Sequence, residues 1–171
     1  TAPIHKQALD LAGVPFPGHT EMLQHACATH QGVSVHDLPV RMMLVNSSLR
    51  VVLVSIHISL REAIRALTPE QLLTTLRITH QAESRWLGRA PRIAVAGLNP
   101  HAGEGGLFGT EDQAIIAPAV GQWAGKGANV SGPHPADALL AKRGHDVYVA
   151  MYHDQAHIPF KVTSPNAGVA M

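Results

Sequence analysis

The sequence is poor in cysteine, in aromatic residues and in long apolar runs. Its single cysteine, Cys27, cannot form a disulfide within the chain, which favours a reducing compartment, and we expect a cytoplasmic protein. Phe, Trp and Tyr make up only 4% of the residues, so the core must be mostly aliphatic. No apolar run approaches the roughly 18 residues of a membrane span, because Arg50, His57 and Arg61 interrupt the best candidate. We therefore expect no membrane-bound segment.

An excess of charge of one sign is also missing. Thirteen Lys and Arg residues oppose twelve Asp and Glu residues, which leaves a formal net charge of +1. Nucleic acid is therefore not expected as a partner, since its binding needs a basic surplus. Hydrophobic residues make up 46% of the chain, and this content at low net charge favours a folded core over disorder.

The length of 171 residues suits one domain, but both ends of the sequence are unusual. There is no initiator Met and no signal-peptide pattern at the start, and no helical pattern or charged tail at the end. Both ends read as cut through a longer chain, with a processed small protein as the alternative.

Apolar β-branched runs alternate with helical periodicity along the chain. Strands are predicted at residues 40–45, 50–58, 92–98 and 146–151, and helices at about 20–29, 69–87 and 110–125. Thr68, Pro69 and Glu70 form a typical helix start, and Gly88 a typical helix stop. Strands that alternate with helices in this way indicate an α/β fold with a largely parallel sheet and flanking helices.

The twelve histidines are the most unusual feature of the composition. Three of them, His57, His101 and His153, each follow a predicted strand, where open parallel sheets place their ligand crevice. Three imidazoles that converge there would hold a divalent metal with open positions for a substrate. Their separation matches no short metal motif, so the prediction depends on their places after the strands. A hydrogen-bonded structural role for each histidine is the alternative.

Other segments allow a functional and a plain reading. The glycine-rich residues 99–106 could bind an anion or form a flexible turn, but they lack the glycine spacing of a dinucleotide loop. His19 and Thr20 stand at a predicted helix start, where an anion could bind or Thr20 could simply act as the N-cap. Asp154 and Lys161 are expected in one loop after the last strand. Asp154 could orient a metal-bound histidine or be an ordinary turn residue. Lys161 could pair with an anionic substrate, move a proton, or merely cap the segment.

The remaining histidines are not assigned a role from the sequence. His5 and His157 lie beside candidate site segments and stay undecided. Those without assigned chemistry are His25, His30, His36, His80, His134 and His145.

Four motifs occur in order: Phe-Pro-Gly-His-Thr-Glu at 16–21, Gly-Leu-Asn-Pro-His-Ala-Gly-Glu-Gly-Gly at 97–106, Pro-Ala-Asp at 135–137 and Met-Tyr-His-Asp-Gln at 151–155. Together they resemble the 4-phosphohydroxy-L-threonine dehydrogenase family of the pyridoxal phosphate pathway. The resemblance runs from about His5 to Lys161. It implies an isocitrate- and isopropylmalate-dehydrogenase-like two-domain α/β fold, of which residues 1–171 would be the central portion, without the N- and C-terminal parts.

The resemblance also implies a reaction. Members of the family are homodimers with the active site at the dimer interface, and they oxidise a secondary alcohol with NAD or NADP and a divalent metal such as Zn, Mg or Co. Decarboxylation of the resulting keto acid would give 3-amino-2-oxopropyl phosphate. The expected partners are therefore a small phosphorylated or carboxylated substrate and a second copy of the chain.

By motif, the metal-binding histidines of the family fall on His57, His101 and His153. Its substrate-binding pair falls on His19 and Thr20, and its substrate-binding lysine on Lys161, which is also a candidate catalytic residue. Asp137 matches an acidic active-site position and is the second candidate catalytic residue. No cofactor-binding residue can be named.

Two departures from this family keep other functions open. Ala156 replaces the usual Gly after His-Asp-Gln, which predicts a stiffer loop. Residues 157–161 with 164–166, together with 142–146, resemble a sister branch of dehydrogenases that act on carboxylated cis-dihydrodiols, such as the terephthalate dihydrodiol enzyme. That branch would also couple oxidation to decarboxylation. A truncated, non-catalytic fragment that binds metal is a third alternative.

Overall fold

The computed structural model describes residues 5–16, 18–142, 144–163 and 169–170. These residues divide into two compact units, Thr1–Val40 and Arg41–Met171, where the sequence indicated no boundary. Residues 164–166, which carry part of the likeness to the dihydrodiol branch, lie outside the described residues.

The first unit is helical and has little core. Its elements are α1 (Lys6–Leu11), α2 (His19–Gln31) and the short 3-10 helix η1 (Val35–Asp37). The helix predicted at 20–29 is confirmed as α2, which ends at Gly32 with a φ of 66°. Gln24 Nε2 donates to the carbonyl oxygens of Val35 (3.2 Å) and Leu38 (2.9 Å), which ties η1 to α2. Among the described residues of this unit, only Ala28 is buried.

The second unit contains a six-stranded sheet in the order β4-β3-β5-β2-β1-β6. The strands are β1 (Met43–Val45), β2 (Arg50–Leu53), β3 (Ile93–Ala96), β4 (Val130–His134), β5 (Val147–Ala150) and β6 (Val169–Ala170). The four strands from β4 to β2 are mutually parallel, whereas β1 pairs antiparallel with both β2 and β6. The predicted α/β class with a largely parallel sheet is therefore confirmed. The run at 50–58 is a strand only as far as Leu53.

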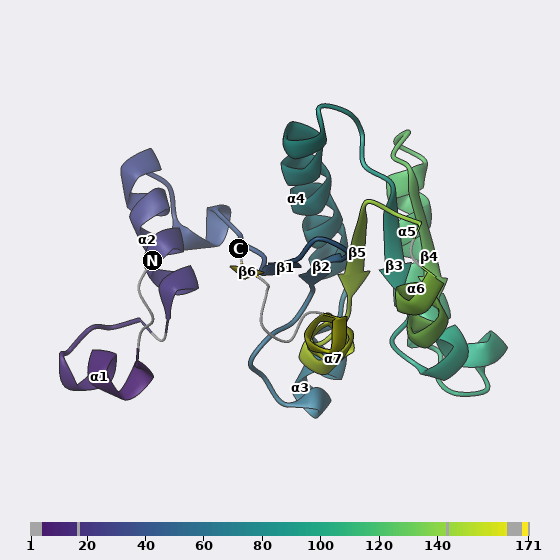
Figure 1. Ribbon diagram of the computed structural model, residues 1–171, viewed down its shortest axis with the longest axis horizontal. Coiled ribbons are helices and arrows are strands. Elements are labelled where there is room, and N and C mark those ends of the chain that lie inside the picture. The colour runs from purple at the N-terminus through teal and green to yellow at the C-terminus, as the bar shows by residue number, and fades with distance from the viewer. Residues whose placement is uncertain (1–4, 17, 143, 164–168, 171) are drawn as a thin grey trace. The chain divides into compact units, whose positions relative to one another are not determined.

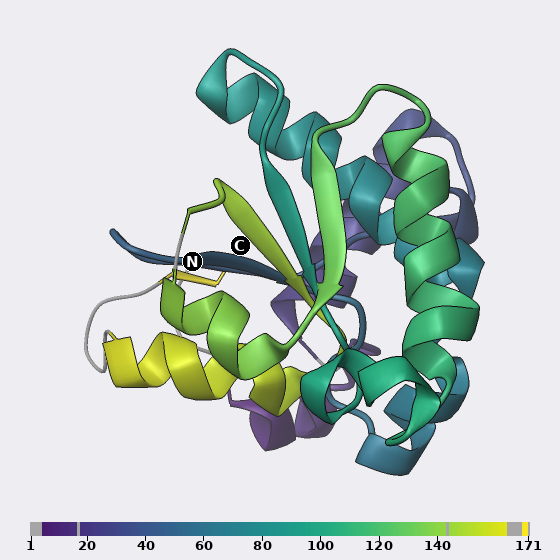
Figure 2. The same ribbon diagram turned by 90° about the vertical axis from the view of Figure 1, so that its right-hand side faces the viewer.

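Helices cover both faces of this sheet (Figures 1 and 2). The helical elements are α3 (Leu60–Ala66), α4 (Pro69–Leu87), the 3-10 segment η2 (Pro100–Gly106), the π-helix η3 (Asp112–Ile116), α5 (Ala117–Ala124), α6 (Ala136–Lys142) and α7 (His153–Thr163). The predicted start and stop of α4 are confirmed, since Thr68 Oγ1 accepts from the Gln71 amide at 3.2 Å and Gly88 is left-handed. The helix predicted at 110–125 forms as η3 followed by α5.

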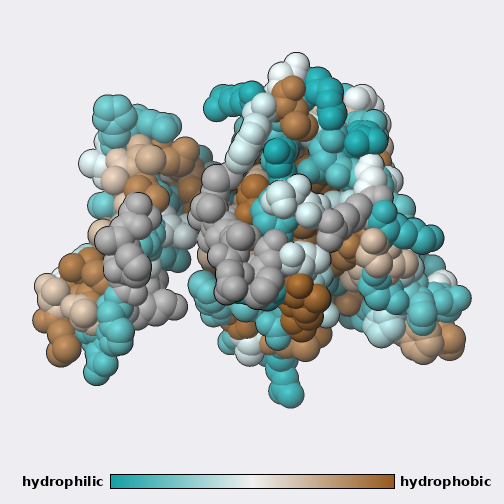
Figure 3. Space-filling view, in the orientation of Figure 1, coloured by the Kyte–Doolittle hydropathy of each residue, from teal (hydrophilic) through white to brown (hydrophobic). Residues whose placement is uncertain are grey.

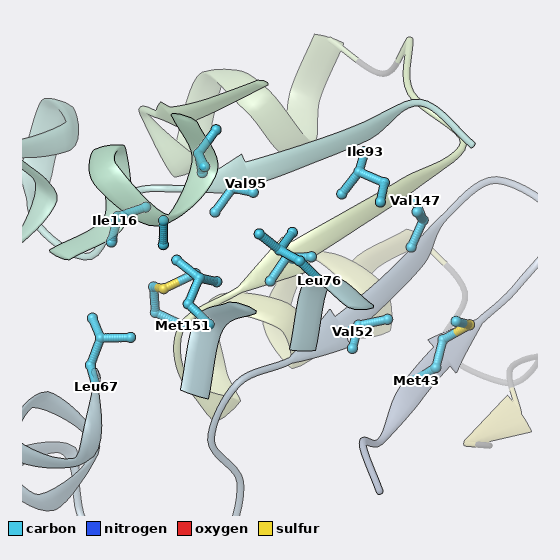
Figure 4. Close-up of a cluster of buried hydrophobic side chains, with 13 residues drawn as sticks. Met43, Val52, Leu67, Leu76, Ile93, Val95, Ile116, Val147 and Met151 are labelled. Carbon is cyan, nitrogen blue, oxygen red and sulfur yellow. The ribbon is translucent and has the colours of Figure 1, made fainter. Parts of the chain in front are cut away.

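The core consists of two apolar layers, one on each face of the sheet. Val52 and Val95 pack with Leu76 of α4 in one layer, where Figure 4 shows these side chains pointing toward one another. Their strand neighbours Val51 and Ala94 pack on the other face, in the layer that includes side chains of α6 and α7. This period-two alternation explains why the strands read as continuous apolar runs in the sequence.

Exposed apolar side chains are distributed over several elements. They include Leu60 and Ile64 on α3, Phe108 after η2, and Ile158 and Val162 on α7. Figure 3 shows hydrophobic surface interspersed with hydrophilic surface. In the described part of the chain, every helix is too short or too polar to cross a lipid bilayer.

Candidate functional site

Three neighbouring parallel strands carry the three histidines of the predicted metal site. β3, β5 and β2 are consecutive in the sheet and parallel, so their carboxyl ends lie at one edge. His101, His153 and His57 each follow the end of one of these strands. The fold therefore delivers all three segments to the edge where parallel sheets bind ligands.

At this edge the structure brings together two of the predicted ligands and one histidine that the sequence left undecided. The ring centroids of His57 and His153 are 5.7 Å apart. His157 stacks on His153 with a centroid distance of 3.7 Å and an interplanar angle of 10°. His101 instead lies beside Phe108, at 6.1 Å. Within the described residues, no three potential ligands converge closely enough to hold an ion in this conformation.

A hydrogen bond from Nδ1 orients the imidazole of His153. Its Nδ1 lies 2.7 Å from Oδ1 of Asp154, so Nδ1 carries the proton that the carboxylate accepts, and Nε2 remains available as a ligand. The suggestion that Asp154 orients this histidine is thus supported by a direct contact.

His157 is held in a similar way. Its Nδ1 donates to the His153 carbonyl oxygen at 3.0 Å. Burial lowers the pKa of His157, and the imidazoles of His153 and His57 and the Lys161 ammonium lower it further, although the bond to the carbonyl opposes them. The neutral form, which can donate a lone pair, is therefore favoured.

Short side-chain hydrogen bonds from Ser55 and Gln155, called the belt below, join the ends of β2, β5 and β3. Ser55 Oγ donates to the Met151 carbonyl oxygen at 2.8 Å, which joins the segment after β2 to the end of β5. The Gln155 side chain accepts from the Met151 amide and donates to the Gly97 carbonyl oxygen, both at 2.7 Å, which joins β5 to β3. The backbones that carry the three histidines are thereby linked.

The glycine-rich segment after β3 is a left-handed turn. His101, Ala102 and Glu104 have φ values of 52°, 53° and 43°, and the glycines at 103 and 105 lie in the same region. Each non-glycine residue in this conformation costs about 1–2 kcal/mol, so the surrounding structure must enforce it. Residues 99–106 therefore form a turn of defined, strained left-handed conformation.

Asp112 holds this turn in place. It is fully buried, and its carboxylate accepts from the amides of Leu98 (2.8 Å) and Asn99 (3.1 Å) and from Asn99 Nδ2 (3.0 Å). A Cβ at Gly97 would lie 2.7 Å from Oδ1 of Asp112, so only glycine fits there. Sequence reasoning missed Asp112. Its position four residues before the inward-facing Ile116, an acid on the buried face of a helix, was the available signal.

The two candidate catalytic residues lie on helices. Asp137 is exposed in the first turn of α6, which follows the carboxyl end of β4. Asp154 and Lys161 were predicted in a loop, and this is wrong: both belong to α7. On this helix Lys161 follows His153 and His157 at intervals of four residues, so the three share one face. Ala156 is buried on the same helix and therefore does not stiffen a loop.

His19 and Thr20 belong to the first unit. α2 begins at His19 with Gly18 as its N-cap residue, so the alternative in which Thr20 is the N-cap is wrong. The side chains of His19 and Thr20 lie in the first turn, where backbone N–H groups and the helix dipole favour an anion.

The fold defines an α/β protein in which the candidate site residues His57, His101 and His153 follow the carboxyl ends of adjacent parallel strands. Residues 1–171 match the family described as pyridoxal phosphate biosynthetic protein PdxA, and the chain belongs to this family.

Individual relatives agree with this assignment. A 4-hydroxythreonine-4-phosphate dehydrogenase of Roseobacter denitrificans is 50% identical over 99% of this chain and 51% of its own length. A D-threonate 4-phosphate dehydrogenase of Cupriavidus necator is 47% identical over 99% of this chain and 50% of its own length. The chain thus spans about half the length of the curated relatives it matches.

Solved structures show the same fold. The crystal structure of 4-hydroxythreonine-4-phosphate dehydrogenase from Klebsiella pneumoniae superposes on this chain with a TM-score of 0.85 at 40% identity. The match covers 99% of this chain and 51% of the Klebsiella chain. The structure of a terephthalate 1,2-cis-dihydrodiol dehydrogenase from Burkholderia xenovorans gives a TM-score of 0.75 at 37% identity. The match covers 84% of this chain and 46% of that one. Both the leading family and the sister branch inferred from the sequence therefore have structural relatives of this chain.

Proposed function

We propose that the protein is a dehydrogenase that oxidises 4-phosphohydroxy-L-threonine with NAD or NADP and a divalent metal, and that decarboxylation then gives 3-amino-2-oxopropyl phosphate. The observation that carries this proposal is the placement of His57, His101 and His153 after three adjacent parallel strands. Membership of the family supports the reaction class and its place in pyridoxal phosphate biosynthesis.

The donor set of these histidines fits a divalent metal ion. Imidazole nitrogens suit Zn²⁺ and several related ions, and the contact with Asp154 leaves Nε2 of His153 available. A bound ion would act as a Lewis acid toward the substrate alcohol and the keto acid formed from it. His57 and His153 form the close pair, and we assign His101 as the third ligand. The belt of hydrogen bonds from Ser55 and Gln155 limits how far the backbones that carry these three histidines can shift.

The remaining assignments concern the substrate. Lys161 lies on the same face of α7 as His153, so its ammonium can pair with a carboxylate or phosphate bound beside the histidines. His19 and Thr20, at the start of α2, are proposed to bind the phosphate. Asp137 is proposed as an acid–base residue. We assign no residue of this chain to the nicotinamide cofactor.

We further propose that the protein acts as a homodimer whose active site lies at the interface, as the family resemblance implies. Light scattering on the full-length protein should give twice the mass of the chain, and a monomer that remains active would contradict this proposal.

A second candidate function is the oxidation of a carboxylated cis-dihydrodiol. The specific observation in its favour is His157, which stacks on His153 and belongs to the segment that resembles the dihydrodiol branch. The names of the relatives add D-threonate 4-phosphate as a further phosphorylated substrate to compare.

A steady-state assay of the full-length enzyme separates these functions. Each of the three substrates is supplied with NAD and Zn²⁺, and formation of NADH is followed for wild type, His101→Ala and the control His30→Ala, which changes an exposed histidine on α2. We expect the highest kcat/KM with 4-phosphohydroxy-L-threonine, a loss of at least about 100-fold in His101→Ala, and no change in His30→Ala.

Other outcomes would redirect the proposal. Turnover of the dihydrodiol alone supports the second function. Full activity of His101→Ala contradicts the metal role of that residue. Binding of Zn²⁺ without binding of NAD by calorimetry would indicate a non-catalytic metal-binding protein.

A further inference from the structure

Asp112 is a buried acidic residue to which the proposed function assigns no role. It is the first residue of η3, and its side chain is fully buried. Both of its oxygens accept hydrogen bonds: Oδ1 from the Leu98 amide at 2.8 Å, and Oδ2 from the amide and from Nδ2 of Asn99, at 3.1 and 3.0 Å. Asp112 therefore joins η3 to the two residues that stand three and two positions before His101.

Glu111 holds the same asparagine side chain. Its Oε2 accepts from Asn99 Nδ2 at 2.8 Å, so this nitrogen donates to both acidic residues at once. Gly109 leaves room for the contact, since a Cβ there would lie 2.6 Å from Asn99 Nδ2 and 2.7 Å from Glu111 Oε2. We call Asn99, Glu111 and Asp112 the clamp.

The clamp is anchored in the core on the side of η3. Ile116, four residues after Asp112, is fully buried, and Val120 of α5 is buried as well. Both pack in the same apolar layer as Leu76 of α4. Because interiors are close-packed, η3 cannot shift far without disturbing this layer. Asp112 is thus a fixed point for the chain that leaves β3.

The turn that carries His101 is the part of the proposed site that most needs such support. In the portion of the chain that the structure describes, only three non-glycine residues have a positive φ, and they are His101, Ala102 and Glu104. The Cβ atom disfavours this conformation, which persists only where surrounding contacts enforce it. The backbone strain of the described structure is therefore concentrated in the segment that presents this histidine.

We propose that Asp112 is a positioning residue for metal binding: through the amides of Leu98 and Asn99 it maintains the strained turn that presents His101. This role rests on the proposed function, in which His101 is the third ligand. Without the clamp the turn relaxes, and an ion recruits His101 only by restoring the strained conformation, so its affinity falls. Asp112 acts through the backbone and is not itself a ligand.

Calorimetric titration of the full-length protein with Zn²⁺, in a buffer free of other metals, compares wild type with Asp112→Asn. Asparagine keeps the size of the side chain but replaces one acceptor oxygen with an NH₂ group, which cannot accept from the amides. At a temperature where circular dichroism shows the variant folded, Zn²⁺ affinity should fall about 10- to 100-fold. Asp37→Asn changes an exposed aspartate of η1, serves as the matched control and should bind like wild type.

The same substitution in the His101→Ala background separates positioning from a general structural effect. Because Asp112 acts through His101, Asp112→Asn should cause no further loss of Zn²⁺ affinity in this background. An equal loss in both backgrounds would overturn the positioning role. Wild-type affinity in Asp112→Asn, with weak binding in His101→Ala, would overturn it too but leave the proposed function intact. Wild-type affinity in His101→Ala would overturn both.

Asn99→Ala replaces Asp112→Asn if that variant does not fold. It removes the side-chain bonds to Glu111 and Asp112 but keeps the backbone amide of residue 99, so a smaller loss of about 3- to 10-fold is expected. This loss should also disappear in the His101→Ala background. Wild-type affinity in folded Asn99→Ala would overturn the proposal.

Discussion

The two ends of the parallel strands are built from different interactions. At the amino ends, ion pairs join the strands to their surroundings: Arg50 at the start of β2 binds Glu83 of α4 at 2.8 Å, and Asp146 before β5 binds Arg89 (2.8 Å) and Arg92 (3.3 Å). At the carboxyl ends, neutral side chains bind backbone groups through the belt of Ser55 and Gln155. The amino edge is therefore closed by ion pairs, whereas the carboxyl edge is closed by hydrogen bonds to backbone groups, which come from Ser55 and Gln155 and, after β3, from the buried Asp112 carboxylate.

This difference separates stability from function. The charged groups at the amino edge neutralise one another; Arg50 in addition lies over the ring of Trp86, 4.6 Å from its centroid. The belt at the carboxyl edge uses backbone groups as partners, and the side chains of His57 and His101 remain exposed. We therefore expect substitutions at the amino edge to change stability, and substitutions at the carboxyl edge to change turnover.

The largest effect is expected from Glu83→Gln at the amino edge. Glu83 is fully buried and its partner Arg50 is partly exposed, so loss of the carboxylate leaves a guanidinium without its counter-charge. The free energy of unfolding should fall by about 2–3 kcal/mol, with kcat/KM unchanged at a temperature where the variant is folded. Urea unfolding measures the first quantity. A large loss of turnover in the folded variant would break the distinction between the two edges.

Gln155→Leu should show the opposite pattern at the carboxyl edge. It removes both hydrogen bonds that join β5 to β3, so the histidines after these strands lose their fixed spacing. We expect kcat/KM to fall by about 10- to 100-fold with a smaller change in stability. Gln155→Glu keeps the acceptor for the Met151 amide but loses the donor to Gly97, so an intermediate loss is expected. Unchanged turnover in both variants would show that the belt has no role in positioning.

Asp146→Asn tests the charges of the amino edge through pH. Hydrogen bonds from Arg89, supported by those from Arg92, hold the pKa of Asp146 far below its usual range. The ion pairs therefore contribute stability above the unfolded-state pKa of about 3.9, and this contribution declines as pH falls further. Because the guanidinium groups of Arg89 and Arg92 are exposed, the free energy of unfolding of wild type should exceed that of the variant by only about 1–2 kcal/mol at pH 7. Unfolding curves from pH 7 to pH 3 should show the difference shrink only below about pH 4, and a constant difference would contradict this account.

The smallest effect is expected from Ala156→Gly on α7. Ala156 is buried in the helix that carries His153, and glycine would remove a packed methyl group and add flexibility to the unfolded chain. A loss of about 1 kcal/mol is expected, with turnover retained because the belt stays intact. A large loss of turnover would mean that α7 itself, and not only the belt, positions the histidine.

The strands of the site could be predicted because they are buried on both faces. Val51 and Val52 face opposite layers, so β2 reads as a continuous apolar run, and the same holds for β3 and β5. β4 was missed because its Val-Ser-Gly-Pro-His sequence has little β-branched character and forms only as an addition to β3. Histidines that follow predicted parallel strands could then be placed at one edge without a metal motif.

Features that depend on tertiary contacts could not be predicted. The left-handed turn at His101 depends on Asp112, whose partners lie earlier in the chain. The stacking of His157 on His153 requires α7, which was mistaken for a loop because Pro159 interrupts its helical pattern. The boundary between the two units could not be predicted because no Gly- or Pro-rich linker marks it in the sequence.

Zn²⁺ titration of the full-length protein tests the central claim most directly. If the carboxyl edge is a three-histidine metal site, calorimetry will show one ion per chain, and adding His57→Ala, His101→Ala or His153→Ala will each weaken binding at least about tenfold. Equal affinity in all of these variants would contradict the claim that these three histidines bind the metal.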